Sequence, residues 1–413
     1  MLRALHWKTE NPTVVVLAGR EAVLAQSSLL EALAARCDQP GAMNWLHYFL
    51  SGQSAKWKHP WLVLLTRADA DPTRLQLDNV WAAVLFSEYR VLGVPTKAFS
   101  TNDSAGMRTV VAPVAQRQAA AAMAIEALMA RGAHTALVSY DNSGRESGRP
   151  AGIWGRNVQW AMRRRLVGKT LLLAETYDAT LANMGKKTRF NLRYYRKRLM
   201  KRMPSEFVAD ARGLLSDSEL LALNTGSLNP CKNSECLLQY ESACRLPGGF
   251  VLGLRGPQGQ WLSLLGGWRQ GDLTVMHWQI NAAGYEKDSI CTVMRSFFVE
   301  REVQRGTRGI TFYGGTPHSM GHSFEHEEVW DLVVRRTSLK AAAFRHAASL
   351  FASPQGLTRR SNFLARTLCH DDLEWYSGSR KLAEATRPAM PASVIGEPFV
   401  RAGFRDKTKI NSA

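Results

Sequence analysis

The alternation of apolar and polar positions is clearest between Gly253 and Tyr313. Two runs in this stretch, Gln260–Gly266 and Leu273–Ile280, are rich in Leu, Val and Trp. Such residues favour an extended, half-buried chain, so both runs predict β-strands. The turn Arg269–Asp272 joins them.

Side chains of the second predicted strand should alternate between two faces, since the period of a strand is two residues. One face would carry Leu273, Val275, His277 and Gln279, and the other Thr274, Met276, Trp278 and Ile280.

A helix and another strand are expected next. After the loop Asn281–Lys287, Asp288 or Ser289 can cap a helix that runs to about Arg305. Its apolar residues recur at helical spacing: Ile290, Val293, Met294 and Phe297. Gly306 ends the helix, and Gly309–Tyr313 has the composition of a strand.

The first half of the chain contains a similar succession. Helical patterns cover Arg20–Ala35 and Ala115–Met129, and strand-like runs cover Trp61–Thr66, Val80–Phe86 and Ala136–Tyr140. The segment Arg-Gly-Ala-His at 131–134 leads into the last of these strands, as Arg-Gly-Thr-Arg at 305–308 leads into the strand of the second half. This echo predicts two related halves.

The order strand, strand, polar loop, helix, strand resembles the core of GNAT-type acyltransferases. In that family a Q/R-x-x-G-x-G/A motif between strand and helix binds the pyrophosphate of coenzyme A, and Gln279–Gly284 is similar to it, with Ala282 at the first glycine position. An ordinary strand-to-helix turn is the alternative interpretation. The resemblance implies acyl-CoA as the donor, with aminoacyl-tRNA as the other candidate, and it implies these cofactor-binding residues: Gln279, Asn281, Ala282, Gly284 and Ser289.

The segment Tyr177–Leu199 resembles the opening of CelD/FemAB-like acyltransferases, in which an aromatic-led helix and a small-residue turn precede a basic helix. The likeness covers roughly residues 176–344. It implies an α/β fold of tandem GNAT-like halves, with mixed central sheets flanked by helices. The expected divisions are a first half at 1–175, a basic linking segment at 176–204, an acyltransferase domain at 205–352 and a C-terminal extension at 353–413.

The sequence departs from this family at two motifs. Asp288-Ser289-Ile290 replaces a Ser-Pro-Gly, and Thr311–Gly315 with His318 and Phe324 replaces an Asp-Phe-x-x-Gly…Tyr-Lys, without the Lys. The identity of the acyl donor is therefore open.

An acyltransferase of this kind needs no protein nucleophile, because the acceptor attacks the donor directly. Candidate bases are His277, Glu286 and His318, and candidate acids are Tyr285 and Tyr313. The expected reaction is acyl or aminoacyl transfer to an amine or hydroxyl of an anionic acceptor, of the cell-envelope or polysaccharide class.

Charge favours an anionic partner. The 413 residues include 53 Lys and Arg against 35 Asp and Glu, a net charge of +18. Candidates are an anionic small molecule, a lipid-linked substrate, tRNA or an acidic membrane surface. The predicted helix Lys186–Arg202 is rich in Lys and Arg and contains no acid. Arg189, Arg193 and Arg196 share one side and could bind phosphate, although a solvated linker helix is the alternative.

No metal site is expected. His318, His322 and His326 have helical spacing, but Pro317 and Gly321 oppose a regular helix there. No run reaches the roughly 18 apolar residues of a membrane helix, and the scattered cysteines suggest reduced thiols, so a cytoplasmic protein, in contact with the inner face of the membrane at most, is expected. The rival hypothesis is a GNAT-like protein without catalytic activity that binds nucleic acid or an anionic membrane.

Overall fold

The structure is a computed structural model that describes residues 13–39, 46, 50, 59–67, 75–91, 94–101, 109–141, 157–312, 320, 323–339, 342–343 and 376–377. Within these residues no helix is long and apolar enough to cross a membrane.

The first half builds a sheet in the order β1-β2-β3-β4-β6. Neighbouring strands are antiparallel except β4 and β6, which are parallel and are connected through helix α4. The elements are β1 (Thr13–Ala18), α1 (Arg20–Leu24), α2 (Ser27–Arg36), β2 (Pro60–Thr66), β3 (Val80–Val91), β4 (Val94–Ser100), β5 (Val110–Val111), η2 (Val114–Gln116), α4 (Arg117–Ala130) and β6 (Thr135–Asp141). The helix predicted at Arg20–Ala35 is thus two shorter helices.

The second half repeats this order as β8-β9-β10-β11-β12, again antiparallel up to one parallel pair, β11 and β12, with α9 as the crossover. Two extra helices precede it. The elements are α5 (Tyr177–Ala182), α6 (Lys186–Arg202), β8 (Glu206–Val208), α7 (Asp217–Thr225), α8 (Asn233–Arg245), β9 (Gly249–Arg255), β10 (Trp261–Gln270), β11 (Leu273–Asn281), η3 (Glu286–Asp288), α9 (Ile290–Gln304) and β12 (Gly309–Phe312).

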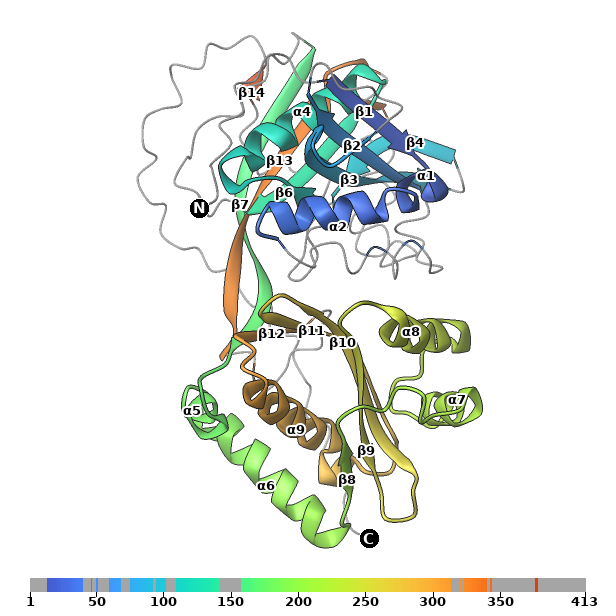
Figure 1. The fold of residues 1–413 in the computed structure, drawn as a ribbon, viewed down its shortest axis with the longest axis vertical. Helices are drawn as coiled ribbons and strands as arrows, with labels where there is room; N and C mark the ends of the chain where they lie inside the picture. Colours follow the sequence, from blue (N-terminus) through green and yellow to red (C-terminus); the bar gives the residue numbers. More distant parts are fainter. Residues whose placement is uncertain are drawn as a thin grey trace, which may run out of the picture. The chain divides into compact units, whose positions relative to one another are not determined.

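The two halves exchange their last strands. Strand β7 (Val158–Leu172) follows β6 in the chain but pairs with β12, and β13 (Glu325–Arg336) follows β12 but pairs with β6. The two exchanged strands also pair with each other over most of their length (Figure 1). A short strand, β14 (Tyr376–Ser377), adds to β7. One continuous sheet therefore connects the halves.

The helices α4 and α9 both end at an Arg-Gly segment, as predicted. Gly132 and Gly306 both adopt a positive φ, +87° and +73°, at the ends of α4 and α9. Glycine is favoured in this conformation because it has no Cβ. Together with the repeated strand order, these ends confirm the predicted α/β fold of tandem halves with a mixed sheet.

Helices cover both faces of the sheet in the second half. Helices α5, α6 and α9 lie on one side and α7 and α8 on the other (Figure 1). One apolar cluster joins Leu192 of α6 and Phe298 of α9 to the sheet, and a separate cluster joins Leu220 of α7 and Tyr240 of α8 to its opposite face. The proposed division of the chain into four segments stays a prediction.

Candidate functional site

The described pairing of the parallel strands β11 and β12 ends before β11 does. They pair from Leu273 opposite Gly309 to Met276 opposite Phe312, whereas β11 continues to Asn281. Within the described residues, which stop at Phe312 on this strand, β11 has no pairing with β12 beyond Met276, and we call this end of the strand pair the splay. Backbone groups along such an open edge are able to bind a carbonyl or amide of a ligand.

A β-bulge lies at the start of this splay. Gly266 of β10 pairs with Trp278 of β11, and Gly267 pairs with Met276. His277 between them has no partner in this pairing and is the extra residue of the bulge. A Cβ at Gly267 would lie 1.9 Å from the Val275 carbonyl oxygen, and this close approach requires glycine. The bulge was not predicted, and it has a direct effect on the faces of the strand.

The predicted alternation of β11 is wrong beyond Met276. Met276 packs with the α9 cluster, but Trp278 and Ile280 pack with α7 and α8 on the other face. The additional residue at His277 shifts the pleat by one position, which reverses the faces of all residues after it.

His277 packs against the Trp268 ring, with ring centroids 5.3 Å apart. Burial lowers the pKa of His277 to about 3, because the imidazolium loses hydration. The side chain is therefore neutral at pH 7 and is a weak proton acceptor.

Two of the predicted cofactor-binding side chains, those of Gln279 and Asn281, are hydrogen-bonded to each other. The Gln279 amide nitrogen donates to Asn281 Oδ1 (2.9 Å), and Ser263 Oγ donates to the same oxygen (2.9 Å). Gln279 Oε1 accepts a hydrogen bond from Arg295 Nε of α9 (2.9 Å). This network fixes the open end of β11 against α9.

The loop between β11 and α9 uses its own backbone donors. The amides of Ala282 and Ala283 donate to the carbonyls of Leu262 and Gly226, each at 2.9 Å, and Gly284 N–H donates to Glu286 Oε1 (3.1 Å). The expected cradle of free N–H groups at 282–284 is thus occupied. These backbone hydrogen bonds, including one from its own N–H, lower the pKa of the exposed Glu286, so its carboxylate is ionised.

Helix α9 begins where the sequence predicts, with Ser289 at the N-cap. Ser289 has φ +51°, however, and its side chain makes no capping hydrogen bond. Asp288 is buried and forms an ion pair with Arg202 of α6, with Arg198 Nε 4.0 Å from its other oxygen. The half-buried Tyr285 packs against the apolar cluster under α9. Helix α6 is thereby held beside the loop.

The three arginines predicted to bind phosphate are engaged within the protein. Arg193 pairs with Asp178 (2.7 Å), Arg196 pairs with Glu300 (2.7 Å), and Arg189 Nη1 donates to the Ala182 carbonyl (3.3 Å). These contacts fasten α6 to α5 and α9.

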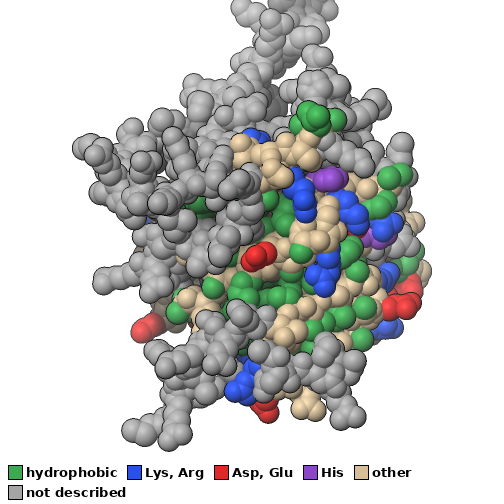
Figure 2. All heavy atoms as spheres, turned by 90° about the horizontal axis from the view of Figure 1, so that it is seen from above, with side chains coloured by type: hydrophobic (Ala, Val, Ile, Leu, Met, Phe, Trp, Pro, Cys, Tyr) green, Lys and Arg blue, Asp and Glu red, His purple; other side chains and the backbone are tan. Residues whose placement is uncertain are grey.

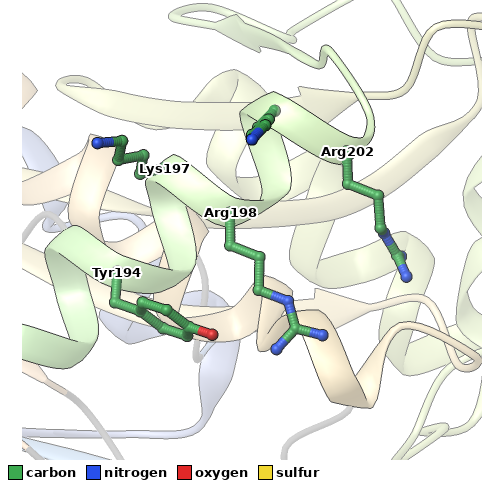
Figure 3. A pocket seen from close by; sticks show the side chains of 5 residues that line it. Tyr194, Lys197, Arg198 and Arg202 are labelled. Atoms are coloured by element: carbon green, nitrogen blue, oxygen red, sulfur yellow. The ribbon is translucent and has the colours of Figure 1, made fainter.

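A different side of α6 lines an open hollow of about 470 Å³. Its residues are Tyr194, Lys197, Arg198, Lys201 and Arg202, and Figure 3 shows Arg198 and Arg202 pointing to the same side of the helix. The end of the molecule seen in Figure 2 instead shows Lys and Arg side chains interspersed with apolar ones. The spacing i, i+3, i+4, i+7, i+8 could have indicated this set from the sequence.

Two of the predicted catalytic residues, Tyr313 and His318, lie outside the described residues, as does His322. Of the predicted acid–base set the structure therefore describes His277 on β11 and Tyr285 and Glu286 in the following loop. Sequence reasoning did not select Arg295, because a single Arg in an amphipathic helix carries no distinctive signal.

No family model and no curated protein sequence matches the chain. Similar solved structures include L-PGS from Bacillus licheniformis, with 9% identity, a TM-score of 0.47 and coverage of 83% of this chain and 97% of that one. FemX has 10% identity, a TM-score of 0.47 and coverage of 76% and 96%. A tandem GNAT protein from the clavulanic acid biosynthesis pathway has 11% identity, a TM-score of 0.38 and coverage of 79% and 99%.

At such identities a likeness to solved structures concerns the fold alone. The repeated strand order, the two parallel crossovers and the exchanged strands are seen in this structure itself and do not depend on that likeness. The chain has the tandem GNAT-like fold implied by its resemblance to CelD/FemAB-like acyltransferases.

Proposed function

We propose that this chain is an acyltransferase whose acyl group lies in the splay between β11 and β12. The observation that carries this proposal is that, within the described residues, the parallel pairing ends at Met276 and Phe312 whereas β11 continues to Asn281. A carbonyl placed there would accept hydrogen bonds from the open edge of β11, which would stabilise the developing oxyanion.

In the reaction, the acceptor amine attacks the carbonyl carbon of the donor. A C–N bond forms, the C–S bond of a thioester or the C–O bond of an ester breaks, and the leaving group takes up a proton as the amine loses one. Neither His277, with a pKa of about 3, nor the ionised Glu286 is a strong base. We therefore expect the acceptor to react as the free amine, and the rate to rise with pH towards the pKa of that amine.

The phosphates of the donor would bind to the hollow on α6 rather than to the loop amides. Lys197, Arg198 and Lys201 line it, and Arg198 also approaches Asp288 just before α9. Through Asp288 these cations are next to the start of α9, where the pyrophosphate of an acyl-CoA would lie. Acyl-CoA is the favoured donor, and aminoacyl-tRNA is the alternative with the same phosphate chemistry.

Calorimetric titration with acetyl-CoA, an aminoacyl-tRNA and a nucleotide sugar tests the proposal. Saturable binding of one acyl donor, followed by transfer to an amine, is the expected result. Binding of the nucleotide sugar with no binding of either acyl donor would contradict it.

A second candidate function is polyanion binding without catalysis. The exposed rings of Phe190 and Tyr194 stack at 5.3 Å and 12° on the same helix as the cationic residues of the hollow. Exposed aromatic rings next to cations suit the bases and phosphates of nucleic acid. Salt-dependent binding of deacylated tRNA together with no detectable acyl transfer would favour this function over the first.

A further inference from the structure

Arg295 of α9 lies at the mouth of the splay. Its Nε donates to Gln279 Oε1 (2.9 Å), and its guanidinium carbon is 5.9 Å from the centroid of the Phe312 ring. Gln279 stands on β11 beyond the last pair with β12, whereas Phe312 is the last paired residue of β12. The guanidinium is therefore placed beside Gln279 of β11 and near the ring of Phe312, the last described residue of β12.

This cation has neutral partners. The two acids of its own helix are paired with other residues, Glu300 with Arg196 and Glu302 with Arg269. Within the described part of the chain no Asp or Glu forms an ion pair with Arg295. Removing a guanidinium from water without a counter-charge is costly, so such an arrangement favours an anion supplied by a ligand.

The guanidinium is also held in a fixed orientation. Gln279, which accepts from Nε, is itself bonded to Asn281 Oδ1 (2.9 Å) and to the Cys291 carbonyl (3.3 Å). Among the residues that the structure describes, none accepts a hydrogen bond from the terminal nitrogens of Arg295, so they can bind a further acceptor. A planar guanidinium with a fixed plane binds a carboxylate through two parallel hydrogen bonds, at a reduced entropic cost.

We propose that Arg295 binds a carboxylate of the substrate in the splay, so that either the transferred acyl group or its acceptor carries a carboxylate. This inference rests on the proposed acyltransferase function and names the substrate class of the same site. A phosphate is the less suitable occupant, because the cationic hollow on α6 already offers a place for the phosphates of the donor.

Two titrations distinguish the sources of the carboxylate. The donor arm compares succinyl-CoA with acetyl-CoA, and the acceptor arm compares L-alanine with L-alaninamide, with and without CoA. We expect the wild-type protein to prefer the carboxylate probe by at least about 10-fold in one arm. Arg295→Gln should abolish that preference, Arg295→Lys should retain part of it, and the exposed Arg305→Gln, which removes the same charge just beyond α9, should leave it unchanged.

Cys291 provides a readout that needs no variant. Its thiol lies 3.7 Å from Gln279 Oε1, one helical turn from Arg295. The preferred carboxylate probe should slow alkylation of Cys291 by iodoacetamide, measured by peptide mass spectrometry, whereas the uncharged counterpart should slow it less.

Three outcomes would overturn the proposal: equal binding of charged and uncharged probes in both arms, a carboxylate preference that survives in Arg295→Gln, or equal protection of Cys291 by both probes. Failure of the proposed function has a different signature. In that case none of acetyl-CoA, CoA and aminoacyl-tRNA binds, while the acceptor arm without CoA still measures whether Arg295 selects a carboxylate.

Discussion

His277 owes its position to the residues opposite it. Gly267 lets the Val275 carbonyl come close, and Gly266 makes room for the Trp278 ring, from which a Cβ at 266 would be 2.3 Å away. The bulge that results turns Gln279 towards α9 and so brings it to Arg295. A glycine without a positive φ can therefore be required as strictly as a glycine in a turn, because a neighbouring atom lies too close to leave room for a Cβ.

The lowered pKa of the half-buried His277 predicts an acid-sensitive fold. Its pKa falls from its ordinary value of 6.5 to about 3 in the folded protein, so between these values the unfolded chain binds a proton that the folded chain does not. Stability should therefore decrease as the pH falls through this window. We expect the melting temperature of the wild-type protein to fall more steeply between pH 6.5 and pH 4 than that of His277→Gln. Parallel curves would contradict the assigned burial.

Replacement of Gly284 tests the loop. Gly284 has φ +87°, and a Cβ built there meets nothing within 4 Å. Because the donor phosphates are assigned to the hollow on α6, Gly284→Val should leave acetyl-CoA affinity within about 2-fold of the wild type, and a loss of about 10-fold or more would mean that the donor contacts the loop. Gly259→Val is the matched control, because Gly259 also has a positive φ, +80°, and open surroundings in the β9–β10 hairpin.

Both Gly variants should lose roughly 1–2 kcal/mol of stability through backbone strain, which thermal melting would measure. A folded Gly284→Val protein with normal donor affinity would show that the loop is only a turn.

At the scale of elements, the basic residues of helix α6 fall into two groups, one that forms ion pairs within the protein and one that lines the hollow. Arg193 and Arg196 hold it to α5 and α9 through Asp178 and Glu300. Lys197 and Lys201 line the hollow and form no ion pair within the described residues. The helix is thus both a structural support and a candidate anion-binding surface, which a count of charges cannot separate.

Two triple variants separate these tasks. Lys197→Gln/Arg198→Gln/Lys201→Gln should weaken binding of acyl-CoA and reduce its salt dependence, measured by titration at about 50 and about 200 mM salt. Arg189→Gln/Arg193→Gln/Arg196→Gln removes the same charge but should mainly lower the melting temperature. Equal loss of binding in both variants would indicate a general effect of net charge.

Elements with strong local periodicity could be predicted from the sequence. Helix α6 and the cores of β10, β11 and α9 lie within a few residues of their expected bounds, because each buries a face that its own residues define. Strand β7 was missed, since Arg163–Arg165 interrupt its apolar pattern and its partners β12 and β13 lie far away in the chain. A strand whose partners are non-local leaves a weak local signal.

Only part of the candidate site could be predicted from the sequence. The sequence places Gln279 near the end of a strand that leads into a helix, and the structure has it on β11, before α9. The role of its amide depends on Arg295, which lies on another element, and the occupied loop amides depend on Leu262 and Gly226 from two further segments. Such contacts are tertiary, so no window of neighbouring residues contains them.

On the scale of the whole molecule, the exchanged strands make each half depend on the other. Strand β13 completes the sheet of the first half and β7 that of the second. Asp331 of β13 lies where they meet, buried, with Oδ1 accepting from Ser139 Oγ of β6 (2.6 Å) and Oδ2 accepting from Arg163 Nε of β7 (2.8 Å). One carboxylate thus connects three strands that come from both halves.

Removal of this carboxylate should destabilise both halves together. Asp331→Ala would remove the carboxylate that pairs with the Arg163 side chain, which is only 26% exposed, at a cost of about 3 kcal/mol. Because the sheet is continuous, we expect a single cooperative unfolding transition at lower temperature, measured by calorimetry. Arg163→Met/Asp331→Leu, which removes both charges and keeps apolar volume, should recover much of the loss. Two separate transitions in Asp331→Ala, with only one of them shifted, would mean that the halves unfold independently and that the exchanged strands do not couple them.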